Sequence, residues 1–230
     1  MLSLAVVCTA AYVDAAGFLL YSGAYVSFMS GNTTRAGVFL ASGFWDQAGL
    51  LAGVILTFVF GAAIGAMIIG VFKKRGQALI LLAVGIGLGA VAALGVYWQM
   101  IRLNDLPRAS LLTLPALMGV MNSAVRQVDK VSVGLTYITG SLTRLGSVIG
   151  SKIINRGVDD RTQNETILVL GSLWFAFLFG ATCGGLAAGH YGLKCVLAPA
   201  ALLVGFGVVR WRGADGATGA RSEKRGASSG

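Results

Sequence analysis

Residues 48–72 of this chain read AGLLAGVILTFVFGAAIGAMIIGVF, which is 25 consecutive positions without a charged side chain. At about 1.5 Å per residue, a helix of this length crosses the roughly 30 Å hydrocarbon layer of a bilayer. Asp46 precedes the run and Lys73 follows it, so both of its ends carry groups that favour water. The stretch therefore predicts a transmembrane helix.

Three more runs outside this stretch repeat the pattern. Residues 76–101 and 166–193 are uncharged apart from a neutral histidine, and the shorter run 195–209 is bounded by Lys194 and Arg210, which can snorkel to the surface. The whole chain is 56% hydrophobic and only 12% charged, against roughly 25% charged in soluble domains. Its 34 glycines suit close helix packing in lipid. We expect an all-α, polytopic transmembrane bundle.

Two apolar units differ from these clean runs because they contain ionisable residues. Residues 1–44 hold Asp14 and Arg35, and residues 109–150 hold Arg126, Asp129, Lys130 and Arg144. Each unit also carries a stretch rich in hydroxyl groups and glycine, SGNTT at 30–34 and TYITGS at 136–141. These features predict helices that are interrupted inside the membrane.

The two units also resemble each other, which predicts an internal duplication. Residues 27–37 align with 136–146, and residues 58–65 align with 177–184. Both segments of the second pair contain a GxxxG spacing, which predicts close helix contacts. The predicted repeats span 1–101 and 109–212, and a one-residue gap places Asp14 on Asn122. The identical pairs of the first alignment are Gly31/Gly140, Thr34/Thr143, Arg35/Arg144 and Gly37/Gly146.

The positive residues predict the topology. If each interrupted unit crosses the membrane once, the chain has six crossings, with 11 positive residues on one side and 3 on the other. The positive-inside rule then places both termini in the cytoplasm. Because three crossings per repeat is odd, the repeats must be inverted, as in many secondary transporters. We expect one transmembrane domain, 1–212, and a disordered cytoplasmic tail, 213–230.

Asp14 is the first candidate for a functional residue, because it is a carboxylate inside an apolar run. An ionised carboxylate in hydrocarbon costs at least about 2.5–3.5 kcal/mol, so it should face the protein interior and a partner. Arg35 and Arg144 are the expected partners. Two interpretations remain open at this stage: a structural ion pair that joins the repeats, or a site coupled to an ion or a proton.

The hydroxyl-rich stretches also admit two interpretations. They can cap helices and form a hydrogen-bond network, or they can direct free N–H groups into a cavity that binds a polar or anionic molecule. The second interpretation predicts a solute site made of Asp14, Ser30, Asn32, Thr33, Arg35, Asn122, Thr139, Ser141 and Arg144.

Composition argues against several other classes of function. One histidine, His190, and three dispersed cysteines do not supply the usual ligands of a metal site. No histidine is placed to activate a serine, so we expect no enzyme activity and no cofactor. The net charge of +9 lies at the ends of apolar runs, which indicates membrane topology and not nucleic-acid binding.

Four motifs are similar to those of the YoaK family of bacterial integral membrane proteins. They are YVDA at 12–15 with Phe18, VSFMSGNTT at 26–34, MGVMNSAVR at 118–126, and TYITGSLTRL at 136–145. The resemblance implies a six-span protein of the bacterial inner membrane that contains a domain of unknown function. It implies no substrate and no catalytic residue.

Two functional hypotheses follow from these features. The first is a small secondary transporter of a polar or anionic solute, in which Asp14 is the coupling group and Arg35 with Arg144 form an electrostatic clamp. The second is a non-transporting membrane scaffold whose buried polar residues only specify helix packing. The lipid bilayer is the expected partner in both cases, and a homo-oligomer is compatible with either.

Overall fold

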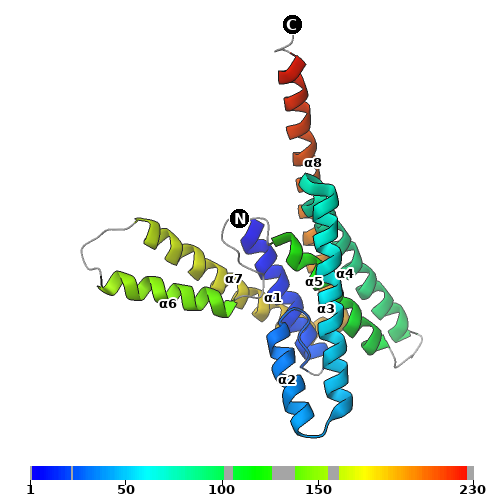
Figure 1. The fold of residues 1–230 in the computed structure, drawn as a ribbon. Helices are drawn as coiled ribbons and strands as arrows, with labels where there is room; N and C mark the ends of the chain where they lie inside the picture. Colours follow the sequence, from blue (N-terminus) through cyan, green and yellow to red (C-terminus); the bar gives the residue numbers. More distant parts are fainter. Residues whose placement is uncertain (1, 22, 101–105, 126–137, 155–160, 227–230) are drawn as a thin grey trace.

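The computed structural model describes residues 2–21, 23–100, 106–125, 138–154 and 161–226, and these residues form helices joined by short connections (Figure 1). The helices lie where the apolar runs predict them. In chain order they are α1 (Leu2–Leu20), α2 (Met29–Ala41), α3 (Trp45–Phe72), the 3-10 turn η1 (Lys73–Arg75), α4 (Gly76–Met100), α5 (Leu106–Val125), α6 (Ile138–Ile154), α7 (Arg161–Tyr191), the 3-10 turn η2 (Gly192–Val196) and α8 (Leu197–Gly226).

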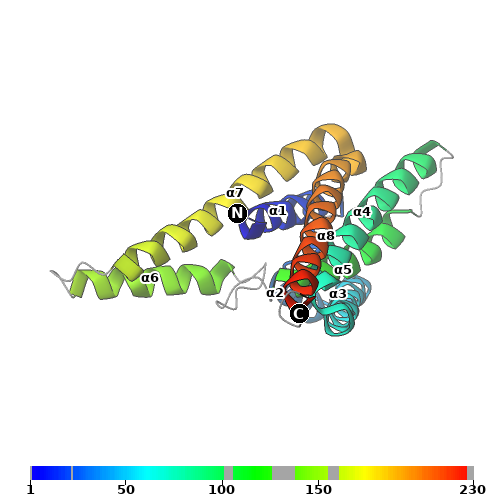
Figure 2. The same ribbon diagram turned by 90° about the horizontal axis from the view of Figure 1, so that it is seen from above.

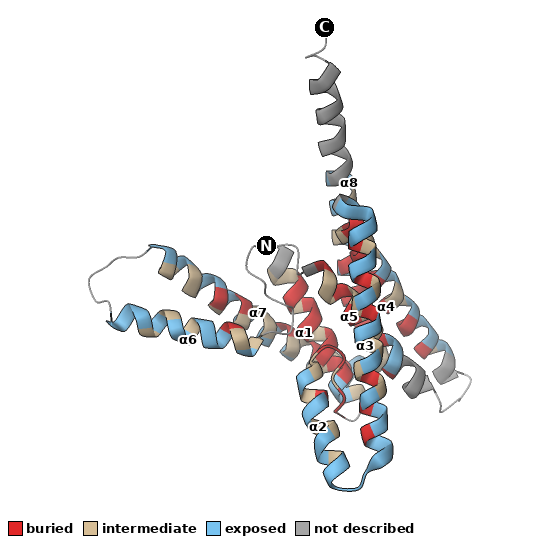
Figure 3. Cartoon of the chain, in the orientation of Figure 1, coloured by how far each residue is buried: buried red, intermediate tan, exposed pale blue. Residues whose placement is uncertain are grey.

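Three stretches within the described residues are long and apolar enough to cross a membrane. They are Trp45–Phe72, Gly76–Tyr97 and the continuous Arg161–Gly213, which contains α7 and α8. Two shorter helical stretches, Leu4–Leu20 and Leu111–Ala124, are also apolar. Large apolar side chains such as Phe60 and Val71 are exposed. Exposed residues run along much of the outer face of α3 (Figure 3). Lipid tails solvate such surfaces, so the fold is that of a helical membrane protein.

Close contacts between backbones join α3 to α5 and α1 to α7. Each pair combines one helix from residues 1–101 with one from residues 109–212. A Cβ atom at Gly61 of α3 would lie 2.7 Å from the carbonyl carbon of Ala116 in α5. A Cβ atom at Gly180 of α7 would lie 2.8 Å from the carbonyl carbon of Cys8 in α1. Both GxxxG predictions are therefore confirmed as sites of tight packing.

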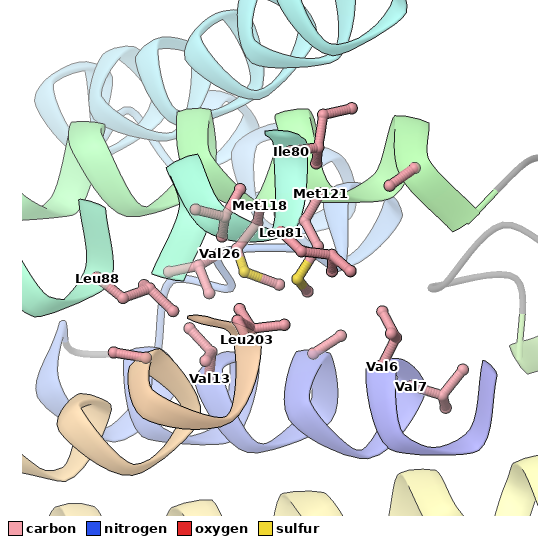
Figure 4. Close-up of a cluster of buried hydrophobic side chains, with 14 of the residues drawn as sticks. Val6, Val7, Val13, Val26, Ile80, Leu81, Leu88, Met118, Met121 and Leu203 are labelled. Carbon is pink, nitrogen blue, oxygen red and sulfur yellow. The ribbon is translucent and has the colours of Figure 1, made fainter. Parts of the chain in front are cut away.

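A third pair, α4 with α8, packs in the same manner, with Gly85 against the carbonyl oxygen of Ala200. The main core lies where α1, α4, α5 and α8 meet (Figure 4). Its side chains include Val13 of α1, Leu88 of α4, Met118 of α5 and Leu203 of α8. Sulfur-containing and branched side chains fill this centre without polar atoms that need partners.

The positions of the interruptions differ from the prediction. Residues 30–34 lie in the first turns of α2, and the described part of the break between α1 and α2 lies upstream, at residues 23–28. Gly23 sets this position because its N–H donates to the carbonyl of Phe18 at 2.7 Å and its φ is +88°, a value that glycine adopts without strain. Residues 138–141, at the end of the second predicted break, likewise begin α6.

The disorder expected for the C-terminal tail, 213–230, stays a prediction. Helix α8 continues through residues 213–226. Once the apolar part of α8 has formed, each further residue adds a hydrogen bond without a new nucleation step. The alanine, arginine, lysine and glutamate residues in this segment have good helix propensity.

Candidate functional site

The carboxylate of Asp14 lies at the break between α1 and α2. Oδ1 of Asp14 accepts hydrogen bonds from the backbone N–H groups of Val26, at 2.8 Å, and Ser27, at 2.7 Å. The side chain is only 4% exposed. One turn of α1 later, Gly17 leaves room for Val26, whose Cγ1 would lie 2.7 Å from a Cβ there. Asp14 thus fixes the chain that leads into α2.

Asn32 of α2 holds the same segment from the other side. Its Oδ1 accepts the N–H of Tyr25 at 2.9 Å, and its Nδ2 donates to the carbonyl of Tyr25 at 2.7 Å. The residue has no solvent exposure. The side-chain amide therefore pairs with both backbone groups of Tyr25, much as a residue of a neighbouring strand would. The Tyr25 ring also stacks near Phe18, with 4.7 Å between centroids.

Arg35 brings a positive charge to this break. A Cβ at Gly23 would lie 2.8 Å from a guanidinium nitrogen of Arg35, so the guanidinium lies directly against the backbone of Gly23. The guanidinium carbon also lies 5.5 Å from the centroid of Phe39, within the range of a cation–π contact. A buried acid, a buried amide and a half-buried guanidinium therefore all surround residues 23–27.

The expected ion pairs of Asp14 with Arg35 and Arg144 stay a prediction. Two backbone N–H groups stabilise the carboxylate, as in an anion site at a helix start. Arg144 is exposed on α6, which packs only on α7 among the described elements and extends away from α2 (Figure 2).

The other predicted site residues lie on three helices, α2, α5 and α6. Ser30 and Thr33 are exposed on α2, where the Thr33 hydroxyl donates to the carbonyl of Met29 at 2.9 Å. Asn122 is half-buried on α5, Ser141 is buried on α6, and Thr139 is exposed there. The structure therefore gathers Asp14, Asn32 and Arg35 around one segment and leaves the α6 residues apart.

Sequence reasoning missed the segment that these residues hold. Gly23, Tyr25 and Val26 are the contacts of Arg35, Asn32 and Asp14. The available signal was Gly23, which follows the first apolar helix closely and marks a helix end. The described residues contain no group of three or more histidine, cysteine, aspartate or glutamate side chains that could hold a metal ion. The chemistry open to the site is charge compensation and hydrogen bonding.

We expect Asn32→Ala to lower the free energy of unfolding by about 2–4 kcal/mol. The substitution leaves the N–H and the carbonyl of Tyr25 without their side-chain partners, at about 1–3 kcal/mol for each group left unsatisfied. Thermal and denaturant unfolding in detergent measure the effect. Thr33→Ala is the matched control, because its hydroxyl bonds only within α2 and the side chain is exposed. Equal stability of the two variants would contradict the role of Asn32.

Comparison with known proteins identifies relatives of the whole membrane domain. The sequence profile of a family described as "Protein of unknown function (DUF1275)" matches residues 2–209. The UPF0700 transmembrane protein RA0705 of Rhizobium meliloti (strain 1021) is 34% identical over 197 residues, which covers 85% of this chain and 79% of the relative. No solved structure matches the chain.

Proposed function

Because the chain belongs to the DUF1275 family, whose description assigns no activity, we propose from its polar break that it is a small secondary transporter of a polar or anionic solute. The observation that carries the proposal is Asp14, a carboxylate buried within an apolar helix that accepts hydrogen bonds from two backbone N–H groups of an irregular segment. Ionisable residues in a membrane are expensive and commonly mark the path of a solute or an ion.

The packing of the helices supports an inverted-repeat plan. Gly61 contacts Ala116, and Gly180 contacts Cys8. The sequence alignment equates Gly61 with Gly180, and Cys8 and Ala116 are separated by the same interval as Asp14 and Asn122. Each half therefore supplies the same type of contact to the other. Helices α1 and α2 run in the same direction in Figure 1, as expected if a broken helix crosses once. Such repeats with broken helices are typical of secondary transporters.

In the proposed mechanism, residues 23–28 form the mobile element of one half, and Asp14 controls it. With the carboxylate charged, the N–H groups of Val26 and Ser27 are bound and the segment is held closed. Neutralisation of Asp14 weakens both hydrogen bonds, since bonds to a charged acceptor are roughly twice as strong. The released N–H groups and Arg35 then face an anionic or polar solute.

The second break contributes the corresponding polar groups of the other half, namely Asn122, Thr139, Ser141 and Arg144. In alternating access the two halves exchange roles, so the separation of α6 from α2 belongs to one end state. We place the site in the bacterial inner membrane, with both termini in the cytoplasm on the strength of the positive residues.

The scaffold hypothesis also has a supporting observation. The hydrogen bonds that Asp14 and Asn32 make to the backbone would specify a unique conformation of the connection between α1 and α2 without any solute. A scaffold needs those hydrogen bonds but not the charge of Asp14. The two hypotheses therefore predict different effects of a neutral isostere at position 14.

We expect Asp14→Asn to abolish solute flux while the protein remains folded. A panel of small carboxylates, amino acids and inorganic anions is first screened for thermal stabilisation of the detergent-purified chain, because a ligand at 100 times its Kd stabilises by about 2.7 kcal/mol. Uptake of the stabilising solute into liposomes is then measured. The variant should fall to the level of protein-free liposomes.

Asp46→Asn is the matched control, because it removes the same charge from an exposed position at the start of α3. Wild-type flux in this control together with lost flux in Asp14→Asn supports transport. Unchanged flux in Asp14→Asn removes Asp14 from the mechanism. A chain that no solute stabilises and that carries no flux favours the scaffold.

A further inference from the structure

Two segments far apart in the sequence meet at one end of the bundle. The turn η1 follows α3, and α8 passes beside it (Figure 1). The guanidinium carbon of Arg75 in η1 lies 5.0 Å from the centroid of the Trp211 ring in α8. This distance is within the range of a cation–π contact. The contact shows that η1 and residue 211 of α8 lie at the same level along the bundle.

Both segments change from apolar to basic residues at the level of this contact. At the end of α3, exposed Val71 and Phe72 precede the basic residues 73–75 of η1. In α8, exposed Val209 precedes Arg210, Trp211 and Arg212. Val71 is 72% exposed and Val209 is 69% exposed, so both are positioned to contact lipid tails. Neither 71–75 nor 208–212 contains an acidic residue. The hydrocarbon layer should therefore end here on both segments at once.

The backbone of η1 adds an independent observation. Lys73 has φ +43°, and it is the only residue other than glycine with positive φ among the described residues. Glycine would adopt this conformation without the steric penalty that a lysine incurs. A lysine at this position keeps a cation beside Arg75 at the expense of a strained turn. We call Lys73, Arg75, Arg210 and Arg212, together with Trp211, the basic collar.

We propose that the basic collar binds the headgroups of anionic phospholipids at the surface of the bilayer. The cationic side chains attract anionic headgroups through their charge, and tryptophan favours the depth of the headgroups. The other end of the same helices lacks this pattern, since α3 begins at Trp45–Asp46 and the only cation of η2 is Lys194. The attraction should thus favour one leaflet and one class of lipid.

Binding is tested with the full-length protein in nanodiscs of phosphatidylcholine, alone or mixed with phosphatidylglycerol. The quantity of phosphatidylglycerol that copurifies with the protein is measured by native mass spectrometry after extraction in mild detergent. Each cation near a charged membrane surface contributes about a fivefold factor in affinity. Arg75→Gln with Arg212→Gln should therefore lower retention by about 25-fold.

Lys194→Gln is the control for net charge, and Arg75→Lys with Arg212→Lys is the control for the Arg75–Trp211 contact. We expect wild-type retention from the first, and at least most of it from the second because the charge is kept. Equal loss from Lys194→Gln, or equal loss from the lysine variant, overturns the proposal. Loss of retained lipid when millimolar inorganic phosphate is added also overturns it, because the collar would then bind free phosphate.

Discussion

Gly61→Ala should destabilise the protein by about 3 kcal/mol or more, although it adds a single methyl group. The new Cβ would lie 2.7 Å from the carbonyl carbon of Ala116 and closer still to its oxygen. Both of these atoms belong to the backbone of α5, so no side chain can rotate away. The α3–α5 interface must separate along its length, and overpacking of this kind costs about 1–3 kcal/mol even where side chains can adjust.

The same experiment has a matched control within α3. A Cβ at Gly70 would meet no atom within 4 Å, so Gly70→Ala adds a methyl group to the same helix on its open side. Alanine has the better helix propensity by up to about 1 kcal/mol. We expect Gly70→Ala to be neutral or slightly stabilising when thermal unfolding is measured in detergent. Similar melting temperatures for the two variants would contradict the close contact at Gly61.

The corresponding pair in the second half is Gly180→Ala, which would meet the backbone of Cys8, and Gly171→Ala, which would meet nothing. The α3–α5 and α1–α7 interfaces share no residue in these contacts, so the losses from Gly61→Ala and Gly180→Ala should add in a double variant. If the two contacts contribute equally to packing, the single variants should lose similar amounts of unfolding free energy, and the double variant should lose their sum.

The fold was predictable wherever one physical property dominates. Residues 48–72 lie within α3, which ends with the apolar run at Phe72 and begins at Trp45, just before Asp46, so the uncharged run accounts for almost the whole helix. The GxxxG spacing also predicted which glycines pack closely. Their partners were not predictable, since a glycine at Gly61 permits approach by any backbone, and only the fold selects Ala116.

The candidate site was predictable only in part. Asp14 and Asn32 were identified from their polarity within apolar segments, and both are buried. Their partners are backbone groups of Tyr25, Val26 and Ser27. Because every residue type carries such backbone groups, the sequence gives no signal that identifies these partners. For this reason, a search for complementary charges led to Arg144, whose helix α6 packs on α7 and lies away from Asp14.

Asp14→Leu should lower the free energy of unfolding by about 3–5 kcal/mol. Leucine has nearly the shape of aspartate but accepts no hydrogen bond, so the N–H groups of Val26 and Ser27 lose their acceptor inside the protein. Each buried donor without a partner costs about 1–3 kcal/mol, and more where the lost acceptor is charged. Unfolding in detergent measures the total effect.

Asp14→Asn is the informative comparison, because an amide oxygen still accepts from both donors. Neutral hydrogen bonds are weaker than those to a carboxylate, but the cost of burying a charge is also removed, so we expect a change of about 1 kcal/mol or less. Hydrogen exchange gives a local measure: the amides of Val26 and Ser27 should exchange much faster than in the wild type in Asp14→Leu, and also faster in Asp14→Asn, because a neutral amide oxygen binds both donors more weakly than the carboxylate does. Unchanged exchange in Asp14→Leu would mean that the carboxylate does not hold this segment. Fast exchange in both variants would show that the charge itself closes the break, and this is the property that a charge-controlled transport cycle requires.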